Sequence, residues 1–581
     1  MTSRHPTLIG RVTSIVGATV VIELEPDLAG ISPTWNGQLH TIGQVGTTVS
    51  LPQGASTLLA SVTRMSMYRP PSTELQASSD LVSMDLRTME VQLLGEIDAL
   101  GEFHRGVSSY PGINDPVHFV SGDDLVPIYP KADEGHLRVG RLSANDAIEV
   151  SLDLQKLVMR HSAVVGSTGA GKSSVVASIL QSLSNGPWPS SRVVVIDSHG
   201  EYASAVTQDS LHTDLATVDS TILPMWLLPS RDILAVLLRG SSSNTLLAKF
   251  ESLVTEARQA FAAEATWLDL SPEEINADSP IPFNLRDVWY QLDKANRRTC
   301  TDRERTIDAL VTEGDAEALR AASFVPYGPT ASEPYKGPDN ATLGTYPEQL
   351  RRAIQDPGLL FLSSGDIEAF KRCDPLPEIV ERILGGGNRI SIIDTSGVSS
   401  TAAEVSIGSI LQLLFELALR GGELELGRAN PLLIVVEEAH RYFGSSPTSR
   451  VASSYVDRIA REGRKYGVGL MLVSQRPSEL PTTAMSQVGT IIALRLNNDA
   501  DQSSVGSALP DSLSGLVQSL PSLRTGEAII AGEALPIPSR VRLKRPNPSP
   551  RSNDPEIAAW TSRPRTRLEL SESLAKWRTS S

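Results

Sequence analysis

The order of apolar and polar positions changes once along the chain, near residue 150. Before that point, short β-branched segments alternate with turns that contain glycine and proline, at residues 8–26, 42–52, 56–65 and 91–98. Two further extended stretches, 118–128 and 147–154, lead toward the change. Evenly spaced segments of this kind predict a small β-barrel.

After residue 150, fully apolar runs alternate with stretches of helical periodicity. The apolar runs are residues 162–166, 192–197, 389–394, 431–438, 469–475 and 490–496. Runs that are apolar on both faces are typical of parallel strands covered by helices on both sides. The sequence therefore predicts an α/β core behind an all-β start.

A long interval separates the second apolar run from the third. Helical periodicity marks residues 244–265 and 284–298, so we expect an inserted helical domain, with a flexible loop at the polar stretch 325–340. A Pro- and Ser-rich stretch at 544–555 precedes a short helical pattern at 557–577. The predicted domains are a barrel at 1–145, a core at 146–204 and 386–543, the insertion at 205–385, and a linker and arm at 544–581.

The composition suits a well-cored protein in a reducing compartment. Of the 581 residues 40% are hydrophobic, and the two cysteines, Cys300 and Cys373, have no C-x-x-C spacing. No apolar run approaches about 18 residues, so we expect a cytoplasmic protein without a membrane span. Lys and Arg number 52 against 67 Asp and Glu, a net charge of −15. This charge argues against a surface coated for nucleic acid, although a basic stripe inside a pore is compatible with it.

The stretch VVGSTGAGKSS, residues 164–174, fits the pattern G-x-x-x-x-G-K-[ST] between a strand and a helix. In that setting backbone N–H groups and the helix N-terminus hold phosphate oxygens, Lys172 reaches the β and γ phosphates, and the Ser173 hydroxyl binds Mg²⁺. The sequence therefore predicts a site for ATP and Mg²⁺. Its nucleotide-binding residues are Gly166, Ser167, Thr168, Gly169, Ala170, Gly171, Lys172, Ser173 and Ser174.

Two acids, Glu437 and Glu438, end the apolar run that starts at residue 431. Ligands gather at the C-terminal ends of strands in open α/β sheets, and an ATPase needs a carboxylate for magnesium and a group that activates water. We therefore assign Glu437 to the magnesium shell through a water molecule and Glu438 to polarising the attacking water. Two adjacent acids can also begin an exposed helix, but the loop upstream favours the catalytic interpretation.

Two further groups of polar residues are ambiguous by themselves. Asp197, His199 and Glu201 follow the second apolar run, where they can sense the γ-phosphate, orient water or simply form a glycine-containing turn. Gln475 ends a later run, and a glutamine there can hydrogen-bond to the γ-phosphate and relay its loss. Neither pattern decides the matter without more context.

A basic cluster precedes the run at 469–475 and contains Arg458, Arg461, Arg464 and Lys465 at helical spacings. An arginine at a subunit boundary can stabilise charge on the ATP of a neighbouring subunit, with an effect on rate of about 10³ or more. The alternative is a solvated helix end whose charges favour the helix dipole. The spacing alone favours that second interpretation.

Taken together, these stretches resemble the HerA family of hexameric ATPases, relatives of FtsK-type DNA pumps in the RecA-like superfamily. The resemblance rests on HSAVVGSTGAGKSS, IDSHGEY, VVEEAHRYF, IAREGRKYGVGLMLVSQRPSEL and LRTGEAIIAG, which occur in the family's order. It implies a RecA-like P-loop ATPase core, an N-terminal barrel of the HAS type and an inserted helical domain.

The resemblance also gives each ambiguous residue a role at the nucleotide. It implies that Asp197, His199 and Glu201 lie on the family's D-x-H-G-E-Y positions and that Gln475 is a sensor. It further implies that Arg464, or else Arg461, acts across a subunit boundary. The family often has Asp at the position of Glu437, and the longer side chain still reaches a magnesium-bound water.

The function implied by the resemblance is an ATP-dependent translocase or helicase that threads double-stranded DNA through the pore of a homohexamer. No unassigned cluster of acids has nuclease-type spacing, so DNA cleavage requires a partner. HerA-like proteins pair with NurA-type nucleases in end resection, and bacterial members are linked with sirtuin-type NAD hydrolases or other effectors in anti-phage defence. The acidic composition and the Pro- and Ser-rich arm favour antiviral defence by analogy. The alternative is an ATP-ordered hexameric scaffold that assembles or silences a partner enzyme, and the net charge of −15 fits it.

Overall fold

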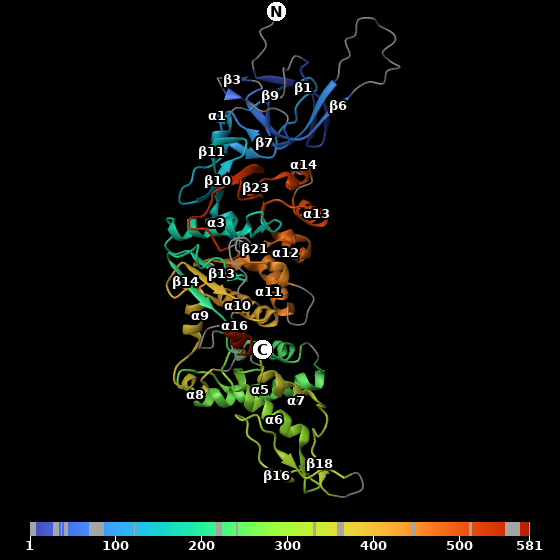
Figure 1. Cartoon of the computed structure of the whole chain (residues 1–581), viewed down its shortest axis with the longest axis vertical. Coiled ribbons are helices and arrows are strands. Elements are labelled where there is room, and N and C mark those ends of the chain that lie inside the picture. Colours follow the sequence, from blue (N-terminus) through green and yellow to red (C-terminus); the bar gives the residue numbers. More distant parts are fainter. Residues whose placement is uncertain are drawn as a thin grey trace, which may run out of the picture.

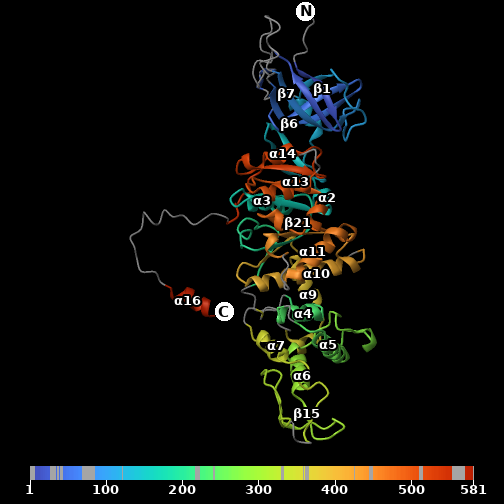
Figure 2. The same cartoon turned by 90° about the vertical axis from the view of Figure 1, so that its right-hand side faces the viewer.

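The computed structural model has three parts that follow one another along its long axis: a barrel, a large sheet covered by helices, and a helical segment (Figures 1 and 2). The sheet lies between the other two parts. The structure describes residues 7–26, 34–35, 38–39, 44–68, 86–120, 122–215, 223–239, 242–328, 333–356, 359, 365–423, 425–443, 449–509, 514–551 and 570–579.

The first part is a closed β-barrel, as the alternating pattern predicts. Its strands pair in the order β2-β1-β9-β5-β6-β7, and β2 also pairs with β7, which closes the ring. Apolar side chains alternate inward, so that Val20 and Ile22 of β2 are buried. The barrel strands are β1 (Leu8–Val16), β2 (Thr19–Leu24), β5 (Thr48–Gln53), β6 (Ser56–Tyr68), β7 (Leu86–Ile97) and β9 (Pro116–Phe119). The short strands β3 (Thr34–Trp35) and β4 (Gln38–Leu39) pair with each other, and β8 (Phe103–Arg105) pairs antiparallel with the end of β7.

The second part is an 11-stranded mixed sheet. Its parallel strands lie in the order β22-β12-β21-β20-β13-β19-β14, and β23, β24, β10 and β11 continue it antiparallel beyond β22. Every apolar run predicted as a core strand is a strand of this sheet. The bounds are β10 (His136–Leu142), β11 (Asn145–Asp153), β12 (Ser162–Val165), β13 (Arg192–Asp197), β14 (Ser210–Asp214), β19 (Ile390–Asp394), β20 (Leu432–Val436), β21 (Val468–Ser474), β22 (Thr490–Ala493), β23 (Glu527–Gly532) and β24 (Ser539–Leu543).

Helices cover both faces of this sheet, which explains why its central strands are apolar throughout. On one face, α3 (Lys172–Asn185) packs with Leu433 and Val435 of β20. On the other face, α10 (Ser400–Arg420) and α11 (Ser449–Glu462) pack with Leu432, Ile434 and Val436. Successive residues of β20 therefore face opposite helical layers, an alternation that also orients the acids after it.

One helix in the described part of the chain, α10, is long and apolar enough to cross a membrane by composition. Its most apolar window is 67% buried inside the protein, and its side chains belong to the core beneath the sheet. The burial identifies α10 as a core helix.

The third part is helical and lies within the interval predicted as an insertion. The two stretches with predicted periodicity are α5 (Asn244–Glu264) and α6 (Leu285–Arg297), and α4 (Ser230–Leu237), α7 (Tyr346–Ile354) and α8 (Ile367–Phe370) accompany them. The pairs β15 (Thr299–Cys300) with β18 (Tyr335–Lys336) and β16 (Leu310–Thr312) with β17 (Ser323–Phe324) form its distal end. The polar stretch predicted as a loop contains β18, and its residues 329–332 lie outside the described ones. The same interval also contributes β14 to the large sheet, and α9 (Leu376–Leu384) packs against β13 and β19.

The remaining helices are short. They are α1 (Gly122–Leu125), α2 (Leu154–Met159), α12 (Thr482–Gln487), α13 (Asp499–Ser507), α14 (Ser514–Gln518) and α16 (Ser571–Thr579), with short 3-10 turns at Val126–Ile128, Met225–Leu227, Pro272–Glu274, Ala439–Arg441, Gly463–Tyr466, Pro477–Glu479 and Leu520–Ser522. Helix α16 overlaps the predicted terminal helix of 557–577, of which residues 557–569 lie outside the described ones.

The stretch predicted as a linker runs along α3 as far as residue 551. The backbone N–H of Asn547 donates to Oε1 of Gln181 on α3, and Nε2 of Gln181 donates to the carbonyl of Pro548. The N–H of Arg551 then donates to the carbonyl of Glu201 at 3.1 Å. The beginning of the arm is thereby held beside the turn that follows β13.

Candidate functional site

The loop between β12 and α3 has the conformation that phosphate binding requires. Gly169 and Gly171 have φ angles of 73° and 106°, which only glycine adopts readily, and α3 begins directly at Lys172. The first turn of α3 contains no acidic residue. The positive end of the helix dipole is therefore available to an anion.

Lys172 and Ser173 are the residues of this loop that fit a nucleotide and its metal ion. The Lys172 side chain is buried, with a relative exposure of 8%, and its ammonium has no ion-pair or hydrogen-bond partner among the described residues. A buried ammonium without a partner is costly, so an anion there would stabilise it. The Ser173 hydroxyl, half-buried beside it, likewise has no hydrogen-bond partner among the described residues.

Neighbouring strands hold the loop in place. The backbone N–H and hydroxyl of Ser167 both donate to the carbonyl of Arg495, at 2.8 and 2.9 Å. The Thr168 hydroxyl donates to Oε1 of Gln475 at 2.7 Å, and the N–H of Gly526 donates to the carbonyl of Ala170. The structure therefore brings Gln475, 307 residues away in sequence, into direct contact with the loop.

Glu437 lies immediately after β20 and is almost completely buried, with an exposure of 2%. Glu437 follows Leu433 and Val435 at every second position, so it lies on the side of the sheet that α3 covers. There the hydroxyl of Tyr202 donates a hydrogen bond to Oε2 of Glu437 at 2.6 Å. Burial raises the pKa of Glu437 to about 8, and the negative charge of Glu438 acts in the same direction.

Glu438 lies beside it in a left-handed conformation, with φ 47° and ψ 43°. The residue is 6% exposed, and Oε2 lies 3.3 Å from Nδ1 of His440 without forming a hydrogen bond. The same nitrogen lies 3.2 Å from Oγ of Ser474, the last residue of β21. An unsatisfied carboxylate oxygen at a strand end is suited to accept a proton from a water molecule.

The turn after β13 places a third acid at this edge of the sheet. Asp197 is fully buried and accepts hydrogen bonds from the backbone N–H groups of His199 and Tyr202. Burial raises the pKa of Asp197, and these hydrogen bonds oppose the rise. The His199 residue is exposed, whereas Glu201 is half-buried with Oε2 lacking a hydrogen-bond partner. The turn thus brings Asp197 and Glu201 close enough to Glu437 to raise its pKa.

Arg461 and Arg464 lie at the other end of the sheet. Arg461 is in the last turn of α11, and Arg464 is in the 3-10 turn Gly463–Tyr466, which immediately precedes β21. The phosphate-binding loop follows the C-terminal end of β12, where Val165 pairs with Ser474. The length of β21 therefore separates Arg464 from the loop of its own chain, about 20 Å at the usual rise of a parallel strand. Both arginines are exposed and have no side-chain partner among the described residues.

Two family models match consecutive parts of the chain. The helicase HerA central domain matches residues 137–414, and the helicase HerA-like C-terminal domain matches residues 386–557. Together they span well over half of the 581 residues. The chain belongs to the HerA family. It is therefore an ATP-hydrolysing enzyme of the helicase type.

HerA proteins of two archaea are similar to this chain over most of their length. The DNA double-strand break repair helicase HerA of Pyrococcus furiosus is 28% identical over 74% of this chain and 72% of its own. That of Saccharolobus solfataricus is 25% identical over 80% and 79%. Among solved structures, VirB4 of Thermoanaerobacter pseudethanolicus has a TM-score of 0.47 and 16% identity, covering 71% of this chain and 97% of its own.

Two side chains of this HerA-family site carry no assigned role in the sequence analysis. Asp394 ends β19 next to Asp197, and a side chain on Gly200 would meet Oδ2 of Asp394 at 2.8 Å. Tyr202 contacts Glu437 across 235 residues of sequence. Asp394 could have been found by the signal that identifies Asp197, since both are acids that end a buried apolar run. The Tyr202 contact has no local sequence signal.

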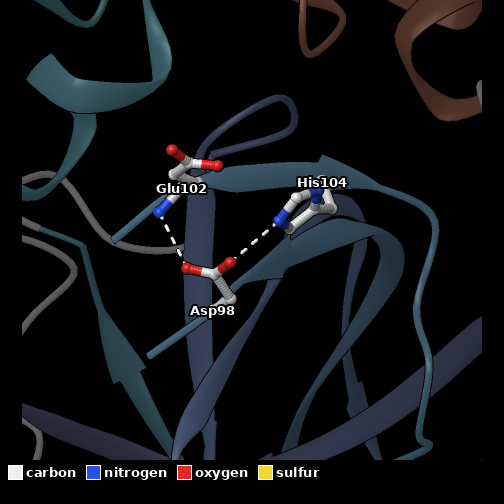
Figure 3. A group of neighbouring side chains, drawn as sticks. All are labelled: Asp98, Glu102 and His104. Atoms are coloured by element: carbon white, nitrogen blue, oxygen red, sulfur yellow. Dashed lines mark hydrogen bonds and ion pairs between the residues drawn. The ribbon is translucent and has the colours of Figure 1, made fainter. Parts of the chain in front are cut away.

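One group of potential metal-ligating side chains lies on the barrel, outside the nucleotide site. Asp98, Glu102 and His104 have potential ligand atoms within 4.8 Å of one another, and no other such group occurs in the described part of the chain (Figure 3). Asp98 accepts the N–H of Glu102, and its Oδ2 lies 2.9 Å from Nε2 of His104. These contacts close the hairpin between β7 and β8. Arg105, which follows, donates to the carbonyls of Gly532 and Leu535 and so ties the barrel to the sheet.

Proposed function

We propose that this HerA-family protein is an ATP-driven translocase or helicase that acts on double-stranded DNA. The observation that carries the proposal is the convergence at one sheet edge of an unpaired lysine, two buried acids and a glutamine bonded to the loop, namely Lys172, Glu437, Glu438 and Gln475. An ATP-driven motor needs charge neutralisation, metal binding, water activation and a sensor of the γ-phosphate. The proposed DNA substrate is supported by the relatives named as DNA double-strand break repair helicases.

Each of these residues has one task in the proposed hydrolysis of ATP. Lys172 neutralises charge on the β and γ phosphates, while the backbone N–H groups of the loop hold their oxygens. Ser173 and, through a water molecule, Glu437 would hold Mg²⁺, and the ion would withdraw charge from the phosphates. Glu438 accepts the proton of the attacking water, for which its unsatisfied oxygen is suited.

The remaining site residues connect hydrolysis to movement. Gln475 joins the loop to the end of β21 and responds to the loss of the γ-phosphate. Asp197, His199 and Glu201 form the turn beside Glu437, and the turn contacts the C-terminal stretch through Arg551. A change at the nucleotide can therefore reach the sheet edge and the arm.

We further propose a closed homohexamer with ATP at each subunit boundary. This assembly is supported by the exposed Arg464, which is too far from its own loop to act there but is free to reach a neighbour's ATP. Mass measurement in solution with nucleotide present tests the assembly. Six copies are expected, and a monomer at micromolar concentration would contradict it.

We propose that the motor is cytoplasmic and works with a separate nuclease or effector, in anti-phage defence or in DNA end processing. The described residues hold one group of three metal-ligating side chains besides the nucleotide site, and that group closes a hairpin. A NurA-like nuclease or a sirtuin-type NAD hydrolase is the class of partner that fits. Co-purification of the protein with the products of neighbouring genes tests this part.

Hydrolysis of ATP with and without duplex DNA tests the proposed motor. A translocase hydrolyses ATP faster when duplex DNA is present and displaces a protein block or a triplex strand from it. A scaffold, which the net charge of −15 favours, hydrolyses ATP at the same rate in both conditions. An unchanged rate in an intact hexamer would therefore replace the motor by the scaffold.

A further inference from the structure

Tyr202 forms the one hydrogen bond that the Glu437 carboxylate makes with the described residues. Its ring is completely buried between the sheet and the α3 layer, and its hydroxyl donates to Oε2 at 2.6 Å. A buried phenol hydroxyl that donates to a carboxyl oxygen at this distance fixes the orientation of both groups. Tyr202 is fixed in turn by its own backbone N–H, which donates to Oδ2 of Asp197 at 3.0 Å.

The surroundings of Glu437 make this single donor important. Among the groups that shift the pKa of Glu437 most, the charged ones are Glu438, Asp197 and Glu201, and all three are acids. Their negative charges disfavour the ionised form of Glu437, and an ionised carboxylate cannot donate a hydrogen bond to it. Tyr202 supplies the directional contact that keeps the Glu437 carboxylate in place.

We propose that Tyr202 is a positioning residue that holds the Glu437 carboxylate by Oε2 and leaves Oε1 for the water shell of a magnesium ion. The inference rests on the proposed role of Glu437 in binding Mg²⁺. Because Tyr202 and Asp197 belong to the same turn, the proposal also makes that turn part of the magnesium site. The turn would then set how tightly the metal ion is held before ATP is cleaved.

The variant Tyr202→Phe tests this role, because it keeps the ring and removes the hydroxyl. We expect the Mg²⁺ concentration for half-maximal ATP hydrolysis to rise about ten-fold, as the loss of one hydrogen bond to a charged group implies, while the rate at saturating Mg²⁺ changes less. Tyr129→Phe is the matched control. Tyr129 is also buried in the α3 layer, and its hydroxyl lies 2.7 Å from Oγ of Ser539, away from the nucleotide loop.

A second variant keeps the test decisive if Tyr202→Phe weakens folding. Glu437→Asp shortens the carboxylate and withdraws it from Tyr202 while the tyrosine stays in the core. The same rise in required Mg²⁺ is expected, and the double variant should show no further rise. Additive effects, or a Tyr202→Phe enzyme with the same Mg²⁺ dependence as Tyr129→Phe, would overturn the positioning role.

The failure of this inference is distinguishable from the failure of the role proposed for Glu437. If Glu437→Gln hydrolyses ATP normally with an unchanged Mg²⁺ dependence, Glu437 does not serve the metal ion and both ideas fall. If Glu437→Gln loses activity but Tyr202→Phe matches the Tyr129→Phe control, the magnesium role of Glu437 stands and only the role of Tyr202 is refuted.

Discussion

The hydroxyl of Thr168 donates a hydrogen bond to Oε1 of Gln475 at 2.7 Å. Thr168 belongs to the phosphate-binding loop, whereas Gln475 follows the last residue of β21, which pairs in register with the strand before the loop. The bond therefore joins the phosphate-binding loop to the C-terminal end of β21, a central strand of the sheet. A side chain that moves with the γ-phosphate can transmit its loss to the rest of the molecule along this path.

Removing this contact should slow hydrolysis more than it weakens nucleotide binding. We expect Gln475→Ala to lower the rate of ATP hydrolysis about ten-fold or more and to reduce its stimulation by DNA, with nucleotide affinity within about three-fold of the wild type. Thr168→Val should act in the same direction but more weakly, and Thr168→Ser, which keeps the hydroxyl, is the control. Equal rates for the valine and serine variants would show that the bond has no role in turnover.

The Lys172→Ala variant should abolish ATP hydrolysis. The buried ammonium has no partner in the described part of the chain, so its charge is available for the β and γ phosphates, and the alanine variant lacks that charge. Phosphate release measured at saturating ATP checks this expectation. Activity above about a tenth of wild type would contradict the assignment of the loop.

The core strands and the phosphate-binding loop could be predicted because their signals are local. Runs such as Val193–Ile196 are apolar at every position since helices cover both faces, and the loop carries its glycines in a fixed pattern. The positions of Glu437 and Glu438 could also be predicted, because they directly follow the apolar run that forms β20. The barrel could likewise be predicted, because short β-branched segments alternate with turns along its sequence.

Contacts between distant segments could not be predicted in the same way. The bond between Tyr202 and Glu437 depends on β13 and β20 being neighbours, which no local pattern specifies. Strand β14 has the sequence SLHTD and is a half-exposed edge strand. It could not be predicted because it contains no apolar run. The sequence places the basic cluster at helical spacing, whereas α11 ends at Glu462 and Arg464 lies in a 3-10 turn.

The two adjacent acids should give different phenotypes. Glu438→Gln should bind ATP but hydrolyse it at least about 100-fold more slowly, since the amide keeps the size of the side chain and cannot accept a proton from water. Glu437→Gln should instead weaken the Mg²⁺-dependent part of nucleotide binding. Trapped ATP in the Glu437→Gln variant together with an active Glu438→Gln variant would mean that the two roles are exchanged.

His161 should make the ATPase core sensitive to acid. It is buried immediately before β12, burial lowers its pKa from 6.5 to about 4, and its Nδ1 accepts the backbone N–H of Leu470 at 3.1 Å. The pKa of His161 is lower in the folded protein than in the unfolded chain, so the unfolded chain binds the proton first as pH falls. The free energy of unfolding is therefore highest above about pH 7 and decreases as pH falls from 6.5 toward 4.

The expected loss between pH 7 and pH 5 is about 2 kcal/mol of unfolding free energy. Urea unfolding at the two pH values measures it. His161→Asn is the comparison, because asparagine tolerates the positive φ of this position and does not titrate. If the variant loses as much stability as the wild type over this range, another group is responsible.

Arg464 should complete the active site of a neighbouring subunit. It lies before β21, while the phosphate-binding loop lies after β12, so the strand length of about 20 Å excludes it from its own site. Arg461 lies three residues earlier, in the last turn of α11, and is also exposed, so either arginine can face across a boundary. We expect Arg464→Ala to reduce hydrolysis by about 10³.

Mixing two inactive variants separates action in trans from action in cis. In rings that contain both Arg464→Ala and Glu438→Gln subunits, some boundaries combine an intact Arg464 from one subunit with an intact Glu438 from the next. Those boundaries should hydrolyse ATP, although each variant alone is nearly inactive. If Arg464 acted on its own subunit's ATP, every subunit in the mixture would carry one defect and no activity could return. Turnover in the mixture therefore supports the trans assignment, and its absence in rings shown by mass to be mixed would refute it, leaving Arg461→Ala as the next variant to mix.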